Sequence, residues 1–177
     1  TPKGLRIHIG LFGRRNAGKS SLINALTNQQ IAIVSDVPGT TTDPVEKACE
    51  LAPVGPVVFI DTAGIDDVGK LGHLRTDRTM SVLGWMDLAL IVCDAAGITD
   101  YEKELFRIVT ANKTPAIVVL NKTDLHAPEA PVISTIKSFN LPFVSVSASE
   151  HIGIDTLRSA IIRTIQEETE PDRPMME

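Results

Sequence analysis

Short apolar runs alternate with segments of helical periodicity along almost the whole chain. The clearest helical segment is 153–168, where isoleucine and leucine recur every three or four residues. The pattern predicts strands at residues 5–12, 46–52, 56–61, 88–94, 116–121 and 142–146. It predicts helices at residues 19–28, 74–85, 101–113, 129–139 and 153–168. This alternation is typical of an α/β fold with a mostly parallel six-stranded sheet and helices on both faces.

Two stretches, 29–45 and 62–73, lack regular periodicity and are rich in Gly, Asp and Thr. Irregular loops of this length in a compact domain are usually functional. The last residues are acidic and contain Pro171 and Pro174, so they resemble a helix that runs out into a linker. We therefore expect one domain at residues 1–168 and, at 169–177, the start of a linker to further domains.

The stretch Gly13–Ser20 reads GRRNAGKS and fits the pattern G-x-x-x-x-G-K-[ST] between a predicted strand and a predicted helix. Backbone N–H groups of such a loop surround a phosphate, and the dipole of the following helix favours the same anion. Lys19 then contributes a charge near the β- and γ-phosphates, and the Ser20 hydroxyl is placed to bind Mg²⁺. Arg14 and Arg15 could contact phosphate or a partner, although solvent-exposed loop arginines are the commoner case. The predicted cofactor-binding residues of this loop are Gly13, Asn16, Ala17, Gly18, Lys19, Ser20 and Ser21.

A second motif, NKTD at 121–124, predicts guanine as the base. The Asp124 carboxylate can accept hydrogen bonds from N1–H and the N2 amino group of guanine. Adenine has no such pair of donors and would leave a buried carboxylate unpaired. We expect the stem of Lys122 to lie along the base and Asn121 to connect this loop to the phosphate loop. Past the next strand, a backbone N–H at Ala148 is predicted to donate to guanine O6, with Ser147 and Ser149 beside it.

A third motif, DTAG, ends the strand at 56–61. Asp61 is expected to hold Mg²⁺ through water, and the N–H of Gly64 is expected to contact the γ-phosphate. Loss of that contact on hydrolysis would release the following loop, as in the order-to-disorder switch of GTPases.

Composition and charge argue against several other classes of function. The chain has 177 residues and a net charge of −5, which argues against broad electrostatic binding to nucleic acid or to an anionic membrane. No apolar run approaches the ~20 residues that span a bilayer, and the start TPKGLRI has no apolar signal-peptide core, so we expect a cytoplasmic protein without membrane contact. Cys49 and Cys93 are expected to be buried, reduced thiols, and no iron–sulfur ligands are expected in this segment.

The motifs GRRNAGKSSLINAL, PGTTTD, DTAGI, NKTD and SVSAS occur in the order found in one group of P-loop GTPases. The chain resembles the translation-factor-like group that contains the tRNA-modification GTPase MnmE and the ribosome-assembly GTPases Era and Der. The resemblance implies a P-loop NTPase fold of the Ras-like G-domain type, with GTP or GDP and Mg²⁺ bound. It also makes Thr41 the second protein ligand of Mg²⁺ and gives a catalytic set of Lys19, Thr41, Asp61 and Gly64.

In this group a P-loop asparagine, matched by Asn16, is associated with a K⁺ ion that supplies positive charge where other GTPases use an arginine. The resemblance implies that Ser35, Val37 and Thr40 complete the K⁺ contacts, and that Thr40 also lies beside the nucleotide.

One position differs from Ras-like enzymes. Where those place a water-orienting glutamine, this chain has Ile65, so we expect a slow intrinsic rate. Asp66 and Asp67 are candidates for a catalytic base, although acidic residues in such loops are usually only solvated.

A closer resemblance is to the HydF family of FeFe-hydrogenase maturation GTPases, through VPGTTTDPVEKACEL and DTAGIDDVGKLGHLR. It implies a regulatory GTPase domain of a scaffold for H-cluster assembly, followed by dimerisation and iron–sulfur domains. The implied partners are the radical-SAM maturases HydE and HydG, the apo-hydrogenase and a second copy of the chain.

Two alternatives stay open. One is an RNA- or ribosome-associated GTPase of the MnmE, Era or Der type, although direct nucleic-acid binding by this acidic segment is not expected. The other is a guanine-nucleotide sensor that binds GTP but barely hydrolyses it, which Ile65 favours.

Overall fold

The computed structural model describes residues 6–27, 45–62 and 76–169. They form one six-stranded sheet with the strand order β2-β3-β1-β4-β5-β6. All neighbouring strands are parallel except β2, which runs antiparallel to β3. The strands are β1 (Ile7–Phe12), β2 (Val45–Leu51), β3 (Gly55–Asp61), β4 (Leu88–Asp94), β5 (Ala116–Asn121) and β6 (Phe143–Ser145).

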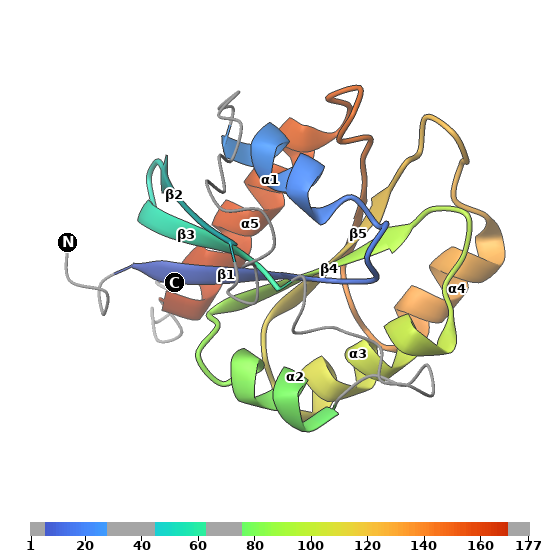
Figure 1. Cartoon of the computed structure of the whole chain (residues 1–177), viewed down its shortest axis with the longest axis horizontal. Coiled ribbons are helices and arrows are strands. Elements are labelled where there is room, and N and C mark those ends of the chain that lie inside the picture. The colour runs from blue at the N-terminus through green and yellow to red at the C-terminus, as the bar shows by residue number, and fades with distance from the viewer. Residues whose placement is uncertain (1–5, 28–44, 63–75, 170–177) are drawn as a thin grey trace, which may run out of the picture.

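Helices cover both faces of the sheet, as Figure 1 shows. Helices α1 (Lys19–Thr27) and α5 (Ile154–Thr169) pack on one face. Helices α2 (Thr76–Leu83), α3 (Asp100–Ala111) and α4 (Ala130–Ser138) pack on the other. The predicted mostly parallel sheet with helices on both faces is therefore confirmed.

Strands β4 and β5 are apolar at every position but the last because both of their faces are buried. In β4, Leu88, Leu90 and Val92 face the core under α1 and α5. The alternate residues Ala89 and Ile91 face the core under α2, α3 and α4. A strand of this kind reads as an uninterrupted apolar run, which is why β4 and β5 have the predicted limits.

Apart from β4 and β5, the elements have ends that differ from prediction by at most two residues. Helix α2 ends at Leu83, two residues before the predicted end, where Gly84 and Trp85 continue as a turn. Helix α3 ends at Ala111, and Lys113 beyond it has a positive φ of 55°, which no α-helix continues through. Helix α5 runs one residue past the predicted limit of the domain; the limits 1–168 and 169–177 stay a prediction.

Strands β1, β3, β4 and β5 all end on the same side of the sheet. We refer to the side on which Phe12, Asp61, Asp94 and Asn121 end these strands as the carboxyl edge. The chain order reverses at β1, which lies between β3 and β4. Open α/β sheets bind ligands outside the carboxyl ends of the strands at such a reversal. Among the described helices, none has the length and apolar character needed to cross a membrane.

Candidate nucleotide site

The loop after β1 takes a conformation that favours glycine at the two fixed glycines of the motif. Gly13 has φ 148° and Gly18 has φ 96°, both in the positive region. A Cβ atom on Gly13 would collide with the carbonyl oxygen of Val92, and one on Gly18 would collide with the Asn121 amide. The loop is therefore packed against β4 and the end of β5, where its backbone reaches the carboxyl edge.

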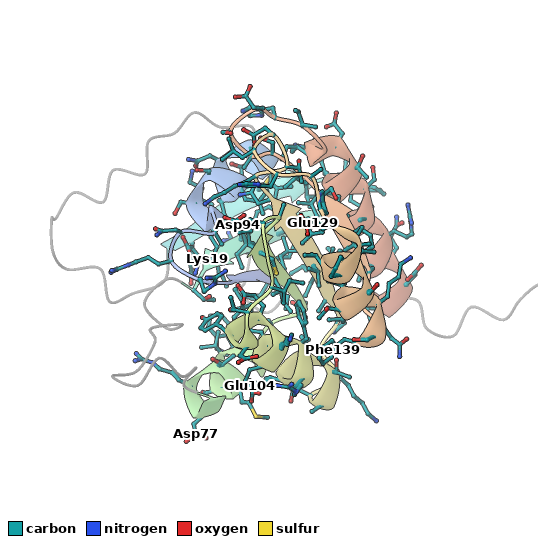
Figure 2. All side chains as sticks on the ribbon, turned by 90° about the vertical axis from the view of Figure 1, so that its right-hand side faces the viewer. Lys19, Asp77, Asp94, Glu104, Glu129 and Phe139 are labelled. Carbon is teal, nitrogen blue, oxygen red and sulfur yellow. The ribbon has the colours of Figure 1, made fainter. Side chains whose placement is uncertain are left out.

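Lys19 opens α1 and lies within this loop rather than in solvent. Its side chain is only 4% exposed, and Nζ donates a 2.5 Å hydrogen bond to the carbonyl oxygen of Gly13. The N–H of Ala17 donates to the carbonyl oxygen of Arg14 at 3.0 Å and closes the turn between them. A buried ammonium group and the N-terminus of a nine-residue helix thus lie at one place, which favours an anion there. Lys19 is labelled in Figure 2.

Ser20 and Asp61 bring two oxygen donors together beside the loop. Ser20 Oγ donates a 2.9 Å hydrogen bond to Asp61 Oδ2, and the Asp61 side chain is buried. Asp61 pairs in register with Leu11 of β1, whose carbonyl oxygen also accepts hydrogen bonds from the Thr62 N–H and hydroxyl. The parallel pairing of β1 and β3 therefore places Asp61 next to the start of α1. A hydroxyl and a carboxylate are donors that suit Mg²⁺.

Asn121 connects the NKTD segment to the phosphate loop, as predicted. Its side chain is 3% exposed, and Nδ2 donates to the carbonyl oxygen of Ala17 at 2.8 Å. Its Oδ1 accepts a 3.0 Å hydrogen bond from the N–H of Ala148. The same N–H is the predicted donor to guanine O6, and that role stays a prediction.

Asp124 is held by the loop after β6. Ser147 Oγ donates to Asp124 Oδ1 at 2.8 Å and lies 3.3 Å from Ser149 Oγ. Thr123 is fixed to the same loop, because its N–H and its hydroxyl both donate to the carbonyl oxygen of Val146. The Asp124 side chain is exposed, whereas the sequence argument treated it as buried. Burial of this carboxylate by the protein is therefore not found, and its role in choosing the base stays a prediction.

Lys122 has a partner that sequence reasoning missed. Its Nζ lies 3.4 Å from Asp94 Oδ2 at the end of β4, and the other Asp94 oxygen accepts the N–H of Ala96 at 2.9 Å. Partial burial raises the pKa of Asp94, but the Ala96 hydrogen bond and the Lys122 charge outweigh it and hold that pKa below its usual value. Asp94, labelled in Figure 2, pairs in register with Asn121 of β5. The signal available in the sequence was an acidic residue at the end of a strand.

Arg14 is also placed differently from the prediction of a solvated loop arginine. Its Nε donates a 2.6 Å hydrogen bond to Oε1 of Glu102, a buried carboxylate in the first turn of α3. Arg15, by contrast, is exposed.

The two cysteines are free thiols. Cys93 in β4 is buried, and its burial raises the pKa of the thiol; Cys49 in β2 is half-buried, and desolvation raises its pKa as well. The prediction of buried thiols thus holds fully for Cys93 and in part for Cys49. In the described ranges, no three His, Cys, Asp or Glu side chains are grouped to hold a metal.

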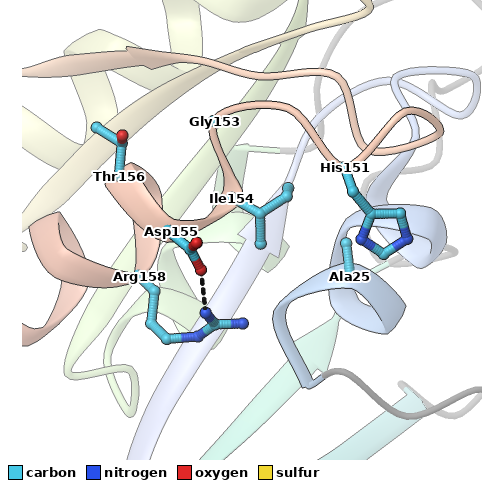
Figure 3. A pocket seen from close by; sticks show the side chains of 7 residues that line it. All are labelled: Ala25, His151, Gly153, Ile154, Asp155, Thr156 and Arg158. Carbon is cyan, nitrogen blue, oxygen red and sulfur yellow. Dashed lines mark hydrogen bonds and ion pairs between the residues drawn. The ribbon is translucent and has the colours of Figure 1, made fainter.

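A hollow of about 270 Å³ lies between the end of α1 and the start of α5. Figure 3 shows Ala25 and His151 on one side of it and Asp155 with Arg158 on the other. Arg158 donates to Asp155 and to the carbonyl oxygen of Leu26, so its guanidinium is engaged within the fold. None of the predicted nucleotide-binding residues lines this hollow.

Several predicted site residues lie outside the described residues, and their roles stay predictions: Ser35, Val37, Thr40, Thr41, Gly64, Ile65, Asp66 and Asp67.

Comparisons with known proteins agree on one family. Residues 8–122 match the family model described as 50S ribosome-binding GTPase. The chain is 37% identical to the tRNA modification GTPase MnmE of Picosynechococcus sp., covering 90% of this chain and 35% of that protein. It is 35% identical to the GTPase Der of Wolinella succinogenes, covering 90% and 36%. The chain thus spans about a third of the length of these relatives.

Solved structures show the same fold. An Era variant of Aquifex aeolicus bound to GDP and AlF4⁻ is 26% identical, covers 96% of this chain and 59% of that one, and superposes with a TM-score of 0.70. Elongation factor SelB of Methanococcus maripaludis in complex with a GTP analogue is 26% identical, covers 91% and 34%, and gives a TM-score of 0.68. These similarities confirm the predicted Ras-like P-loop fold.

Proposed function

The chain is a GTPase domain that belongs to the 50S ribosome-binding GTPase family, and we propose that residues at the carboxyl edge of its sheet hold GTP with Mg²⁺ for hydrolysis. The observation that carries the proposal is the placement of Lys19: a buried ammonium at the start of α1, inside a glycine loop. A triphosphate with its charge at this point gains the lysine charge, the helix dipole and the loop N–H groups together.

The donor set beside Lys19 suits Mg²⁺. Ser20 Oγ and Asp61 Oδ2 lie 2.9 Å apart and belong to two rigid elements, α1 and β3. Ser20 is the direct ligand in this proposal, Asp61 acts through water, and Thr41 is the second protein ligand. When bound, the metal neutralises charge on the β- and γ-phosphate oxygens.

Guanine is selected by Asp124 in this proposal. The Ser147 hydroxyl binds one carboxylate oxygen and so fixes the orientation of the other toward the N1–H and N2 donors of the base. Asp94 does the same for Lys122, whose stem is proposed to lie along the base. Because Asn121 bonds to Ala17, the position of the base is coupled to that of the phosphates.

For the chemical step we propose K⁺ at Asn16, Ser35, Val37 and Thr40, since charge that grows between the β- and γ-phosphates needs a nearby cation. Asn16 is exposed in the loop between the anchored residues Arg14 and Ala17, where it can reach such an ion. Ile65 supplies no group that orients water, so turnover is proposed to be slow and to respond to partners.

Two biological roles are proposed, each from its own observation. The strings VPGTTTDPVEKACEL and DTAGIDDVGKLGHLR favour a regulatory domain in FeFe-hydrogenase maturation, with HydE, HydG and apo-hydrogenase as partners. The names of the similar proteins favour tRNA modification or a ribosome-linked role instead: MnmE acts in tRNA modification, and one Era structure, 27% identical, contains nucleotides of 16S ribosomal RNA.

Nucleotide titration of the purified protein with GTP, GDP and ATP tests the site, with Lys19→Ala beside the unaltered protein. We expect GTP and GDP to bind, ATP not to compete, and Lys19→Ala to lose binding or turnover. A fully active Lys19→Ala variant refutes the assignment. The role is tested in cells with the full-length protein carrying Lys19→Ala: lost hydrogenase activation with intact tRNA modification and ribosome assembly supports maturation, and the reverse supports the alternative.

A further inference from the structure

Glu102 is an ionisable residue that the nucleotide chemistry does not use, yet it is almost completely buried. Its side chain is 1% exposed in the first turn of α3. Glutamate is rarely buried to this extent unless both oxygens have partners. Here Oε2 accepts the N–H of Thr99 at 2.9 Å and also the Thr99 hydroxyl, while Oε1 accepts Arg14 Nε at 2.6 Å.

Arg14 connects this carboxylate to the phosphate loop across 88 residues of sequence. Its side chain is 42% exposed, so the guanidinium reaches Glu102 with its Nε edge while part of it stays in solvent. The carbonyl oxygen of Arg14 accepts the Ala17 N–H and closes the loop turn. Arg14 is thus fixed at its side chain by α3 and at its main chain by the loop.

A second anchor holds the opposite end of the same turn. Asn121 Nδ2 binds the carbonyl oxygen of Ala17. The loop is therefore held at both residues that close its turn, by Glu102 from α3 and by Asn121 from β5, and the exposed residues Arg15 and Asn16 lie between the two anchors.

We propose that Glu102 is a positioning residue for nucleotide binding: acting through Arg14, it holds the phosphate loop in the conformation that receives the β-phosphate. The inference rests on the proposed assignment of this loop to the phosphates. A short hydrogen bond between charged partners is stronger than a neutral one and restricts the angle as well as the distance. A loop that is already held in place loses less conformational entropy when the ligand binds, so its affinity for the ligand is higher.

A purely structural role for Glu102 is the competing explanation. With Thr99, it forms a capping box at the start of α3, and such caps stabilise helices wherever they occur. That role predicts that a Glu102 variant has a lower Tm but an unchanged affinity for nucleotide. The positioning role predicts an effect on nucleotide affinity that requires Arg14.

The test measures dissociation constants for fluorescent GDP and a GTP analogue, together with Tm, for Glu102→Gln, Arg14→Met and the double variant. A glutamine has a single acceptor oxygen and cannot serve Thr99 and Arg14 together. We expect each single variant to raise the dissociation constants of both nucleotides about tenfold. The double variant should raise them no further, since the two residues act as one unit.

Two control variants distinguish an effect on the position of the phosphate loop from an effect on the stability of the fold. Glu104→Gln removes a carboxylate of the same helix whose pair with Arg107 is exposed, and it should leave the dissociation constants unchanged. Thr99→Ala removes one partner of the cap and should lower Tm while affinity stays within about twofold.

Three outcomes overturn the proposal. In the first, Glu102→Gln lowers Tm but binds nucleotide like the unaltered protein. In the second, Arg14→Met weakens binding while Glu102→Gln does not, which would mean that Arg14 touches the nucleotide itself. In the third, Glu102→Gln fails to fold and Arg14→Met, altered at a partly exposed side chain, retains full affinity. Absence of GTP binding by the unaltered protein would instead refute the proposed function.

Discussion

The hydroxyl of Ser147 donates a 2.8 Å hydrogen bond to Oδ1 of Asp124, and this contact joins the loops that follow β5 and β6. The two residues are 23 positions apart, and Ser147 is completely buried whereas Asp124 is exposed. A buried donor thus holds one oxygen of an exposed carboxylate. The free rotation that an exposed aspartate would otherwise have is removed before any base is bound.

Asp124→Asn should reverse the preference for the base. An amide presents a donor where guanine N1–H needs an acceptor, so GTP affinity should fall by about 100-fold or more while xanthine nucleotide is accepted. Competition titrations with GTP and XTP measure this. Ser147→Ala should weaken GTP binding by a smaller factor, about tenfold, and should not allow XTP to bind. Unchanged GTP affinity in Asp124→Asn would contradict the guanine assignment, and Ser138→Ala, an exposed hydroxyl on α4, serves as control.

Asn121→Ala should destabilise the fold as well as the site. It leaves the Ala17 carbonyl and the Ala148 N–H without their partner, and both groups lie in buried residues. At about 1–3 kcal/mol for each of the two unpaired buried groups, the free energy of unfolding should fall by about 2–6 kcal/mol. Urea unfolding without nucleotide measures it. Asn112→Ala, at an exposed asparagine after α3, should lower the free energy of unfolding only slightly. An equal decrease in both variants would contradict a stabilising role for the Asn121 contacts.

K⁺ should accelerate GTP hydrolysis relative to Na⁺ by about tenfold or more, because a cation beside the growing charge lowers the barrier. Phosphate release measured in matched KCl and NaCl at equal ionic strength provides the comparison. Asn16→Ala should remove the difference and leave GDP affinity nearly unchanged. Equal rates in the two salts for the unaltered protein would eliminate the role of K⁺.

Stability should depend on pH through Asp94. Its pKa is lowered in the folded protein, so the carboxylate stabilises the fold above the ordinary aspartate pKa of about 3.9, and this contribution is lost as pH falls through the lower folded value. The free energy of unfolding of Asp94→Asn should therefore lie below that of the unaltered protein at pH 6, and the difference should shrink below about pH 4. A difference that stays constant from pH 3 to 7 would sink this explanation.

The sheet could be predicted because its signal is local. Strands β4 and β5 are apolar at nearly every position, so their limits follow from composition alone. The P-loop and NKTD motifs were equally local, and their meeting at the carboxyl edge follows from parallel strands that end on one side. The helix ends were harder, since the glycine after Leu83 has no positive φ, and after Ala111 the residue with positive φ is Lys113 rather than a glycine.

The missed contacts are those between distant segments with common residue types. The local sequence around Arg14 does not distinguish a solvated arginine from one that is hydrogen-bonded to Glu102. The pairing requires α3 to begin beside the phosphate loop. The pair of Lys122 with Asp94 has the same origin: it depends on the neighbouring positions of β4 and β5. Burial of Asp124 was expected from its chemistry, whereas the structure leaves this residue exposed.

The crowding of Gly18 by the Asn121 amide limits how this domain can be redesigned. Exchanging the NKTD loop for one that reads another base would also withdraw the group that packs on, and bonds to, the phosphate loop. The inserted loop must therefore supply its own amide to the Ala17 carbonyl. Without it, we expect the engineered protein to bind every nucleotide more weakly rather than to prefer a different one.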